Sequence, residues 1–126
     1  MNESSDNLSI SARPNALVLF NPVFNNGPDN YGYERLGDRY AEISPYHNIK
    51  KGAAPTIVFL GTKDHLIPVK TAKDYQEKMR SMGSRCDLFL YEGQGHGFFN
   101  FTKGKKYYEE TLLQAEKFLR ELGYVK

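Results

Sequence analysis

The sequence lacks several features that would place it in a specialised class of protein. Its 126 residues contain no tryptophan and one cysteine, Cys86, so an intrachain disulfide and a thiolate zinc site are both excluded. Lysine and arginine number 17 against 15 aspartates and glutamates, and the resulting net charge of +2 is too small for a dedicated nucleic-acid binder. No apolar run approaches the roughly 20 residues that span a bilayer. We therefore expect a protein without a membrane span that binds no nucleic acid.

The amino-terminal residues lack the pattern of a secretory signal peptide. Residues 1–13 have neither a basic start nor an apolar stretch, so we expect a cytoplasmic chain as given. A longer parent protein could still carry an export signal. Residues 1–14 are rich in serine and asparagine, and we interpret them as a flexible tail or the remnant of a linker. We expect residues 15–126 to be the carboxyl-terminal portion of a single domain.

Three short apolar runs predict buried strands at about residues 16–20, 56–60 and 87–91. Uninterrupted apolar runs of this length are typical of parallel sheets, in which both faces of a strand are covered. Apolar spacing predicts helices at about residues 71–82 and 105–122. Because strands and helices alternate, the sequence predicts an α/β fold with a parallel sheet and a right-handed crossover between the second and third strands.

Both predicted helices carry an apolar stripe. The spacing predicts that Ala72, Tyr75, Met79 and Met82 are the buried residues of the first helix, with Thr71 and Asp74 as its capping box. In the second helix the buried face is expected to contain Tyr108, Leu112, Ala115, Leu119 and Leu122. Residues 21–54 form a long connection without an obvious element, in which Ser44-Pro45 is expected to open a short helical turn.

A three-stranded parallel sheet leaves the first strand without a neighbour on one edge. The run 16–20 has no polar alternation, so it is expected to have neighbours on both edges and cover on both faces. Exposed edges of this kind invite pairing with another chain. We expect the chain either to be part of a larger domain or to form a homo-oligomer through this strand.

Asp64 and His96 are the candidate catalytic residues. Each follows a predicted strand, and binding sites of open α/β sheets form at the carboxyl ends of the strands. A carboxylate that accepts the Nδ1–H of a histidine fixes the ring tautomer and stabilises the imidazolium, as in a catalytic triad. The alternative is that Asp64 is a turn former and His96 a solvated loop residue.

The other chemistry-bearing residues have simpler interpretations. We expect His65 to be incidental to its turn, His47 to be a packing or hydrogen-bonding residue, and Cys86 to be a small buried hydrophobe. A zinc site formed by Asp64, His65 and His96 is a less favoured alternative. The basic residues Lys103, Lys105 and Lys106 are expected to form the solvated start of a helix.

Two motifs resemble those of α/β-hydrolases. Residues 61–68, GTKDHLIP, are similar to the acid-bearing turn G-x-x-D-x-x-[VI]-P, and residues 93–98, GQGHGF, are similar to the histidine loop G-x-x-H-G-F. The resemblance is to the branch of acetyl esterases, feruloyl esterases and dienelactone-hydrolase-like proteins. It implies that Asp64 is the triad acid, that His96 is the general base, and that the three strands are the sixth to eighth of the family sheet.

The sequence departs from the family pattern in lacking a nucleophile. The family order is Ser, Asp, His, with the serine in G-x-S-x-G. None of the serines at positions 4, 5, 9, 11, 44, 81 and 84 lies in that motif, and no glycine-rich oxyanion loop is present. We therefore expect this chain to be the carboxyl-terminal half of an esterase or lipase and to be inactive alone. The intact enzyme is expected to act on a small-molecule ester without a cofactor.

Two alternatives use the same residues differently. The chain could be a short non-catalytic module that dimerises through its first strand. It could also be a flavodoxin-like or receiver-like domain, although no phosphate-binding glycine loop follows the first strand.

Overall fold

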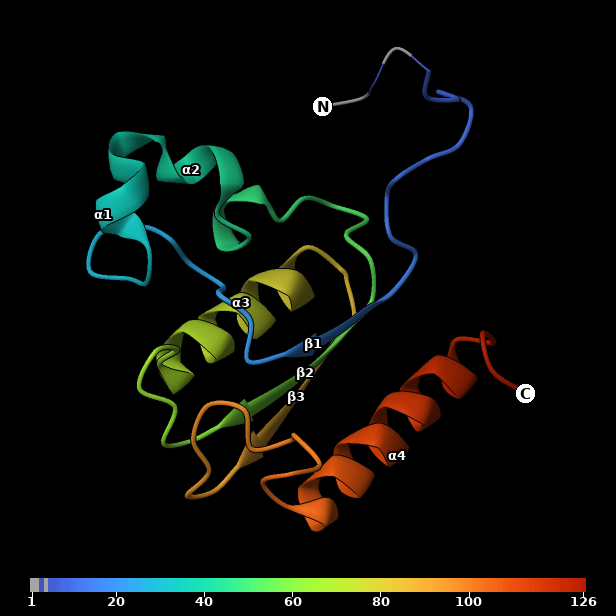
Figure 1. Ribbon diagram of the computed structural model, residues 1–126. Coiled ribbons are helices and arrows are strands. Elements are labelled where there is room, and N and C mark those ends of the chain that lie inside the picture. Colours follow the sequence, from blue (N-terminus) through green and yellow to red (C-terminus); the bar gives the residue numbers. More distant parts are fainter. Residues whose placement is uncertain (1–2, 4) are drawn as a thin grey trace.

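The computed structural model describes residue 3 and residues 5–126 (Figure 1). Residues 1, 2 and 4 of the predicted tail lie outside the described residues. The chain folds into one parallel sheet in the order β1-β2-β3, flanked by helices, which confirms the predicted α/β class. The strands are β1 (Leu17–Phe20), β2 (Thr56–Gly61) and β3 (Cys86–Tyr91). Each begins or ends one residue away from its predicted bounds.

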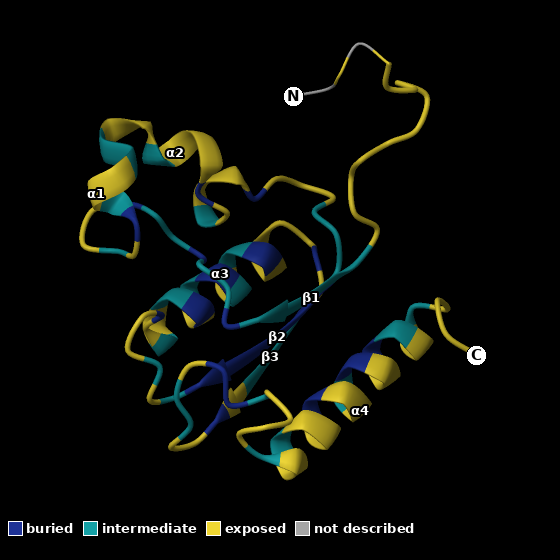
Figure 2. Cartoon of the chain, viewed as in Figure 1, coloured by how far each residue is buried: buried dark blue, intermediate teal, exposed yellow. Residues whose placement is uncertain are grey.

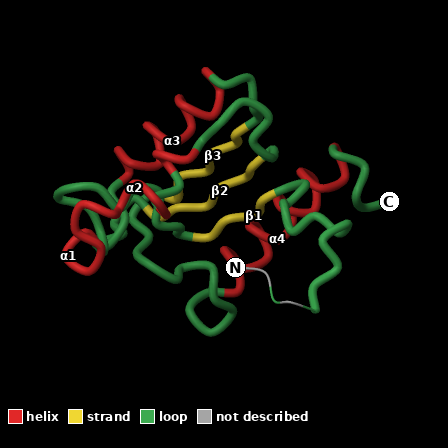
Figure 3. The backbone as a smooth tube through the Cα atoms, turned by 90° about the horizontal axis from the view of Figure 1, so that it is seen from above, coloured by secondary structure: helices red, strands yellow, loops and turns green. Residues whose placement is uncertain are grey.

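The two long helices cover opposite faces of the sheet (Figures 1 and 3). Helix α3 (Val69–Ser81) packs on one face through Ala72, Tyr75 and Met79, which join a core with Val58 and Leu60 of β2. Helix α4 (Lys105–Glu121) covers the other face, where Ala115 and Phe118 pack against Ile57 and Phe59. Both faces of β2 are therefore buried, as its uninterrupted apolar sequence requires.

Helix α3 begins earlier and ends earlier than predicted. Its amino-terminal cap is Pro68, and the Thr71 hydroxyl donates back to the Pro68 carbonyl (2.8 Å), so Thr71 lies inside the first turn and the predicted capping box is wrong. Asp74 instead accepts from the ammonium of Lys70 (2.5 Å). Met82 lies past the last turn and is 38% exposed, which corrects its placement in the core.

The buried stripe of α4 also differs from the prediction. Thr111, Ala115 and Phe118 are buried, whereas Tyr108 and Leu112 are 40% and 55% exposed. Leu119 and Leu122 are partly buried against the core, as expected. The helix therefore presents one part of its predicted apolar face to the sheet and leaves another part uncovered.

Residues 21–54 form a chain of short helical turns on the α3 side of the molecule (Figure 1). These turns are α1 (Tyr33–Leu36), η1 (Gly37–Arg39), α2 (Tyr40–Ile43) and η2 (Tyr46–Asn48). The ring of Phe24 packs on Tyr75 with centroids 4.9 Å apart, and the Lys78 ammonium donates to the Tyr46 carbonyl (2.7 Å). The helical turn expected after Ser44-Pro45 is present as η2.

Strand β1 is less covered than its neighbour (Figure 2). All six residues of β2 are buried, whereas all four residues of β1 are only partly buried. No described residue pairs with the outer edge of β1 within the sheet. No helix in the described part of the chain is long and apolar enough to cross a membrane.

Candidate active site

Asp64 lies in a tight turn directly after β2. Its backbone N–H donates to the Gly61 carbonyl (3.2 Å), and its side chain reaches forward to the residues that follow it. Oδ1 accepts from the backbone N–H groups of Leu66 (2.9 Å) and Ile67 (3.1 Å). The side chain is completely buried. One carboxylate oxygen is therefore held by the backbone, and the other is free for a second partner.

That second partner is His96. The loop after β3 brings its Nδ1 to 2.9 Å from Asp64 Oδ2. Because an ionised carboxylate can only accept, Nδ1 carries the proton and Nε2, on the far side of the ring, keeps its lone pair. The His96 side chain is 49% exposed. The arrangement pairs a buried orienting carboxylate with a base that solvent can reach.

The two loops are tied together by backbone contacts. The Lys63 N–H donates to the Gln94 carbonyl (2.8 Å), and the Gly93 N–H donates to the Thr62 hydroxyl (2.8 Å). A Cβ at Gly61 would lie 2.2 Å from the Gln94 carbonyl oxygen, so this close approach requires glycine. The geometry of the Asp64–His96 pair is thus set by the loops and by the strands beneath them.

Two of these supporting residues are not signalled by the sequence motifs. The Thr62 hydroxyl falls at a variable position of the acid turn. The Lys103 ammonium donates to the His96 carbonyl (3.3 Å) from the loop that precedes α4. The sequence suggests a solvated role for Lys103, and no local pattern predicts its contact with a loop seven residues earlier.

The other predicted candidates do not join this site. His65 is exposed, and within residue 3 and residues 5–126 no three His, Cys, Asp or Glu side chains are grouped to hold a metal ion, so the zinc alternative has no support. Cys86 is 1% exposed, and burial raises the pKa of its thiol to about 11, in keeping with a buried structural residue.

A second serine–histidine contact lies in the 21–54 segment. The Ser44 hydroxyl is 2.8 Å from His47 Nδ1 and accepts from the Asn26 backbone N–H (3.1 Å). Ser44 is fully buried, so no substrate reaches its oxygen. The His47 ring packs edge-on against Tyr40 and Tyr46. This pair is a structural link, in agreement with the packing role expected for His47.

Two buried polar side chains among the described residues lack a hydrogen-bond partner. They are the carboxamide of Asn21 and the hydroxyl of Tyr91. Asn21 follows β1 at the same edge of the sheet where Asp64 follows β2 and His96 follows β3. Burial raises the pKa of Tyr91 to about 12.

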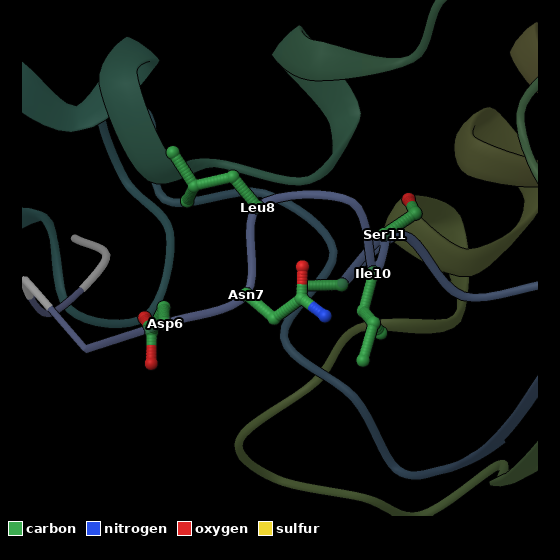
Figure 4. A pocket seen from close by; sticks show the side chains of 6 residues that line it. Asp6, Asn7, Leu8, Ile10 and Ser11 are labelled. Atoms are coloured by element: carbon green, nitrogen blue, oxygen red, sulfur yellow. The ribbon is translucent and has the colours of Figure 1, made fainter.

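The surface has an apolar hollow next to the histidine loop. Its volume is about 160 Å³, and its lining includes Phe20, Phe99, Phe101, Tyr108 and Leu112. Another hollow is lined by Asp6, Asn7, Leu8, Ile10 and Ser11 (Figure 4). Because all of its walls come from one short amino-terminal stretch, it has no support from the folded core and carries no functional interpretation.

The sequence pattern of the dienelactone hydrolase family matches residues 28–122, which is more than half of the chain and contains both Asp64 and His96. The chain belongs to this family. Among curated relatives, an acetylxylan esterase of Xylanibacter ruminicola is 26% identical over 87% of the chain and 25% of its own length. Esterase LipC of Mycobacterium tuberculosis is 33% identical over 52% of the chain and 17% of its own length.

Solved esterase structures match nearly the whole chain. The propionate-bound esterase 2 of Thermogutta terrifontis superimposes with a TM-score of 0.87 and 38% identity, covering 99% of this chain and 49% of that one. The same esterase phosphorylated by paraoxon matches with a TM-score of 0.85 and 40% identity, over 98% of this chain and 46% of that one. The chain spans about half the length of these structures.

Proposed function

We propose that the chain supplies the acid and base of a Ser-His-Asp carboxylic-ester hydrolase. The observation that carries the proposal is the 2.9 Å contact between Asp64 Oδ2 and His96 Nδ1 at the carboxyl ends of β2 and β3. Membership of the dienelactone hydrolase family and the likeness to esterases support a hydrolase. The nucleophile elbow and oxyanion loop of this enzyme lie outside these 126 residues.

In the proposed mechanism His96 transfers one proton in each of two half-reactions. Nε2 takes the proton of a serine hydroxyl as its oxygen attacks the ester carbonyl, and gives that proton to the departing alcohol as the ester C–O bond breaks. Water then attacks the carbonyl of the acyl-serine while Nε2 takes its proton, and this proton passes to the serine oxygen as the acyl C–O bond breaks and the acid leaves. Asp64 stays ionised throughout, held by the Leu66 and Ile67 N–H groups, and stabilises the imidazolium that forms.

The substrates we propose are esters of short-chain carboxylic acids. The support comes from the related proteins: structures of the Thermogutta esterase carry propionate or butyrate, and one relative is named acetylxylan esterase. The use of an activated serine is supported by the phosphorylation of that esterase by paraoxon, since organophosphates react with such nucleophiles.

The first test is the intact mass of the chain after treatment with a fluorophosphonate probe. We expect no adduct, since no serine of the chain lies in a nucleophile elbow. A single adduct that is lost in His96→Ala would show that the chain carries its own nucleophile and would overturn this part of the proposal.

The second test measures the roles of Asp64 and His96 directly. The chain is co-expressed with the remaining part of the Thermogutta esterase, that is, the residues of that esterase with no counterpart in this chain. Hydrolysis of 4-nitrophenyl butyrate is then measured. We expect Asp64→Asn to lower kcat by about 10⁴-fold because it favours the wrong tautomer of His96. Activity that is insensitive to both Asp64→Asn and His96→Ala would contradict the proposed roles.

The half-covered strand β1 also favours one alternative, a non-catalytic module that dimerises through this edge. Sedimentation at micromolar concentration separates the two, because a monomer excludes the dimer.

A further inference from the structure

The backbone of His96 is held by a single hydrogen bond within the described part of the chain. The residue lies in the loop after β3 between two glycines, Gly95 and Gly97. Glycine restricts the backbone less than any other residue, so this loop needs contacts from elsewhere to keep one conformation. Neither the N–H nor the carbonyl of His96 pairs with the backbone of a described residue. The bond comes from the Lys103 ammonium, which donates to the His96 carbonyl (3.3 Å).

Residues 97–104 fold so that Lys103 reaches back over the histidine loop. The Asn100 N–H donates to the Gly97 carbonyl (3.1 Å), and the Lys103 N–H donates to the Asn100 carbonyl (2.8 Å). Gly97 has a φ of 76°, and a Cβ there would lie 3.0 Å from Asn100 Nδ2 and 3.4 Å from Lys103 Nζ. The missing side chain of Gly97 therefore leaves the space through which the ammonium reaches the His96 carbonyl.

Lys103 differs from the other lysines at the start of α4. The positive end of a helix dipole disfavours cations, and the first turn of α4 has no acidic residue to offset them. Lys105 lies 3.3 Å from the carboxylate of Glu109, and the Lys106 ammonium lies 5.4 Å from the centre of the Tyr107 ring. The solvated role that the sequence suggests for all three therefore fits these two lysines better than Lys103.

We propose that Lys103 is a positioning residue of the candidate active site, and that it holds the His96 backbone so that the ring stays on Asp64. This inference rests on the proposed function. Asp64 fixes the ring through Nδ1, whereas Lys103 fixes the main chain that carries the ring. Lys103 acts through the His96 carbonyl and touches neither the substrate nor the reacting atoms.

Both contacts are needed because a general base must be placed as well as oriented. A misplacement of about 1 Å is enough to slow an enzyme-catalysed reaction strongly. The His96 side chain is 49% exposed, so packing alone leaves the ring room to move. A charged donor suits the task because its hydrogen bonds are stronger than those of a neutral donor. Since Lys103 is exposed, its effect should be several-fold, smaller than that of Asp64.

The first readout is the tautomer of the His96 ring in the 126-residue chain, measured from the ¹⁵N chemical shifts of its two nitrogens at one pH. We expect Lys103→Met to raise the fraction protonated on Nε2 at least twofold, because the ring leaves Asp64 more often. Lys103→Arg keeps a cationic donor and should restore the wild-type fraction. Lys105→Met is the matched control, since it removes the same charge from the same end of α4 without contacting His96. Thermal stability should be unchanged in all three variants.

The second readout is hydrolysis of 4-nitrophenyl butyrate by the chain co-expressed with the remaining part of the Thermogutta esterase. Lys103→Met is expected to lower kcat about fivefold and to leave KM unchanged, because Lys103 does not contact the substrate. Lys103→Arg and Lys105→Met should both stay within twofold of the wild type.

Several outcomes would overturn the inference. These are a His96 tautomer that is unchanged by Lys103→Met, an equal effect of Lys105→Met, or a failure of Lys103→Arg to restore the wild-type tautomer. Hydrolysis that depends on His96 but not on Lys103 would overturn it as well. Failure of the proposed function has a different signature. In that case Lys103→Met still changes the tautomer, but hydrolysis is insensitive to His96→Ala.

Discussion

At the scale of single residues, Gly61 sets the distance between the two loops of the candidate site. No other residue type fits there, because a Cβ would meet the carbonyl oxygen and carbon of Gln94 at 2.2 and 2.6 Å. Both are backbone atoms, so the clash is relieved only by moving the histidine loop. The Asp64–His96 contact therefore depends on the absence of a side chain three residues before Asp64.

We predict that Gly61→Ala destabilises the chain by about 2 kcal/mol and breaks the Asp64–His96 hydrogen bond. Gly95→Ala is the control, since a Cβ there comes no closer than 3.8 Å to the Lys63 carbonyl oxygen and its φ is unstrained. Urea unfolding gives the stability, and the proton signal of His96 Nδ1–H reports the hydrogen bond. Equal effects of the two substitutions would show that the close approach is unimportant.

At the scale of elements, the turns of residues 21–54 depend on Ser44. Its buried hydroxyl joins Asn26 to His47, two residues that are far apart in this segment. We predict that Ser44→Ala destabilises the chain by about 1–2 kcal/mol, because it leaves the partly buried Asn26 N–H without its acceptor. Hydrogen exchange should accelerate in residues 24–48 and stay unchanged in β2.

Ser81→Ala is the control for this prediction. The Ser81 hydroxyl is exposed at the end of α3 and donates to the Lys78 carbonyl (2.8 Å), so its loss should change stability by less than about 0.5 kcal/mol. If Ser44→Ala is equally mild, the turns are held mainly by the packing of Phe24 on Tyr75.

The elements also show how far the sequence alone can predict this structure. The strands were predictable because short continuous apolar runs are typical of strands that are buried on both faces. The Asp64–His96 contact was predictable because each residue directly follows a strand, at the same edge of the sheet. The buried face of α4 was only partly predictable. Periodicity identifies an apolar stripe that includes Leu112, but it does not say which part of the stripe meets this sheet and which part stays uncovered.

The contacts that support the site were less predictable still. Thr62, Lys103 and the Gly61–Gln94 approach depend on the spatial relation of two loops, and no local pattern encodes that relation. The orphan amide of Asn21 depends equally on tertiary burial. The position of both loops at the carboxyl ends of strands, and the resemblance of residues 61–68 and 93–98 to known motifs, indicated that the two loops act together.

At the scale of the whole molecule, the stability should fall at alkaline pH. Burial raises the pKa of Cys86 from 9 to about 11 and that of Tyr91 from 10 to about 12. Each group ionises more readily in the unfolded chain, so its contribution is intact below pH 9 for Cys86 and pH 10 for Tyr91. The contribution is lost as pH rises toward the folded-state values.

We therefore predict that the urea midpoint decreases between pH 9 and pH 12, and that Tyr91→Phe makes this decrease shallower. The same substitution should leave stability at pH 7 unchanged or slightly higher, because it deletes a buried hydroxyl without a partner. An alkaline profile identical in the variant would show that Tyr91 ionises normally in the folded chain.

The hydrogen bond between Asp64 and His96 has an entropic consequence. Fixing an imidazole in one rotamer and one tautomer lowers its conformational entropy. Because Asp64 holds the ring, this entropy is lost during folding of the two loops and not during the reaction. A serine brought near Nε2 would meet a base that is already oriented. The effective concentration of that base would then be set by how rigidly the serine is held beside the ring, and no rearrangement within the two loops would be needed.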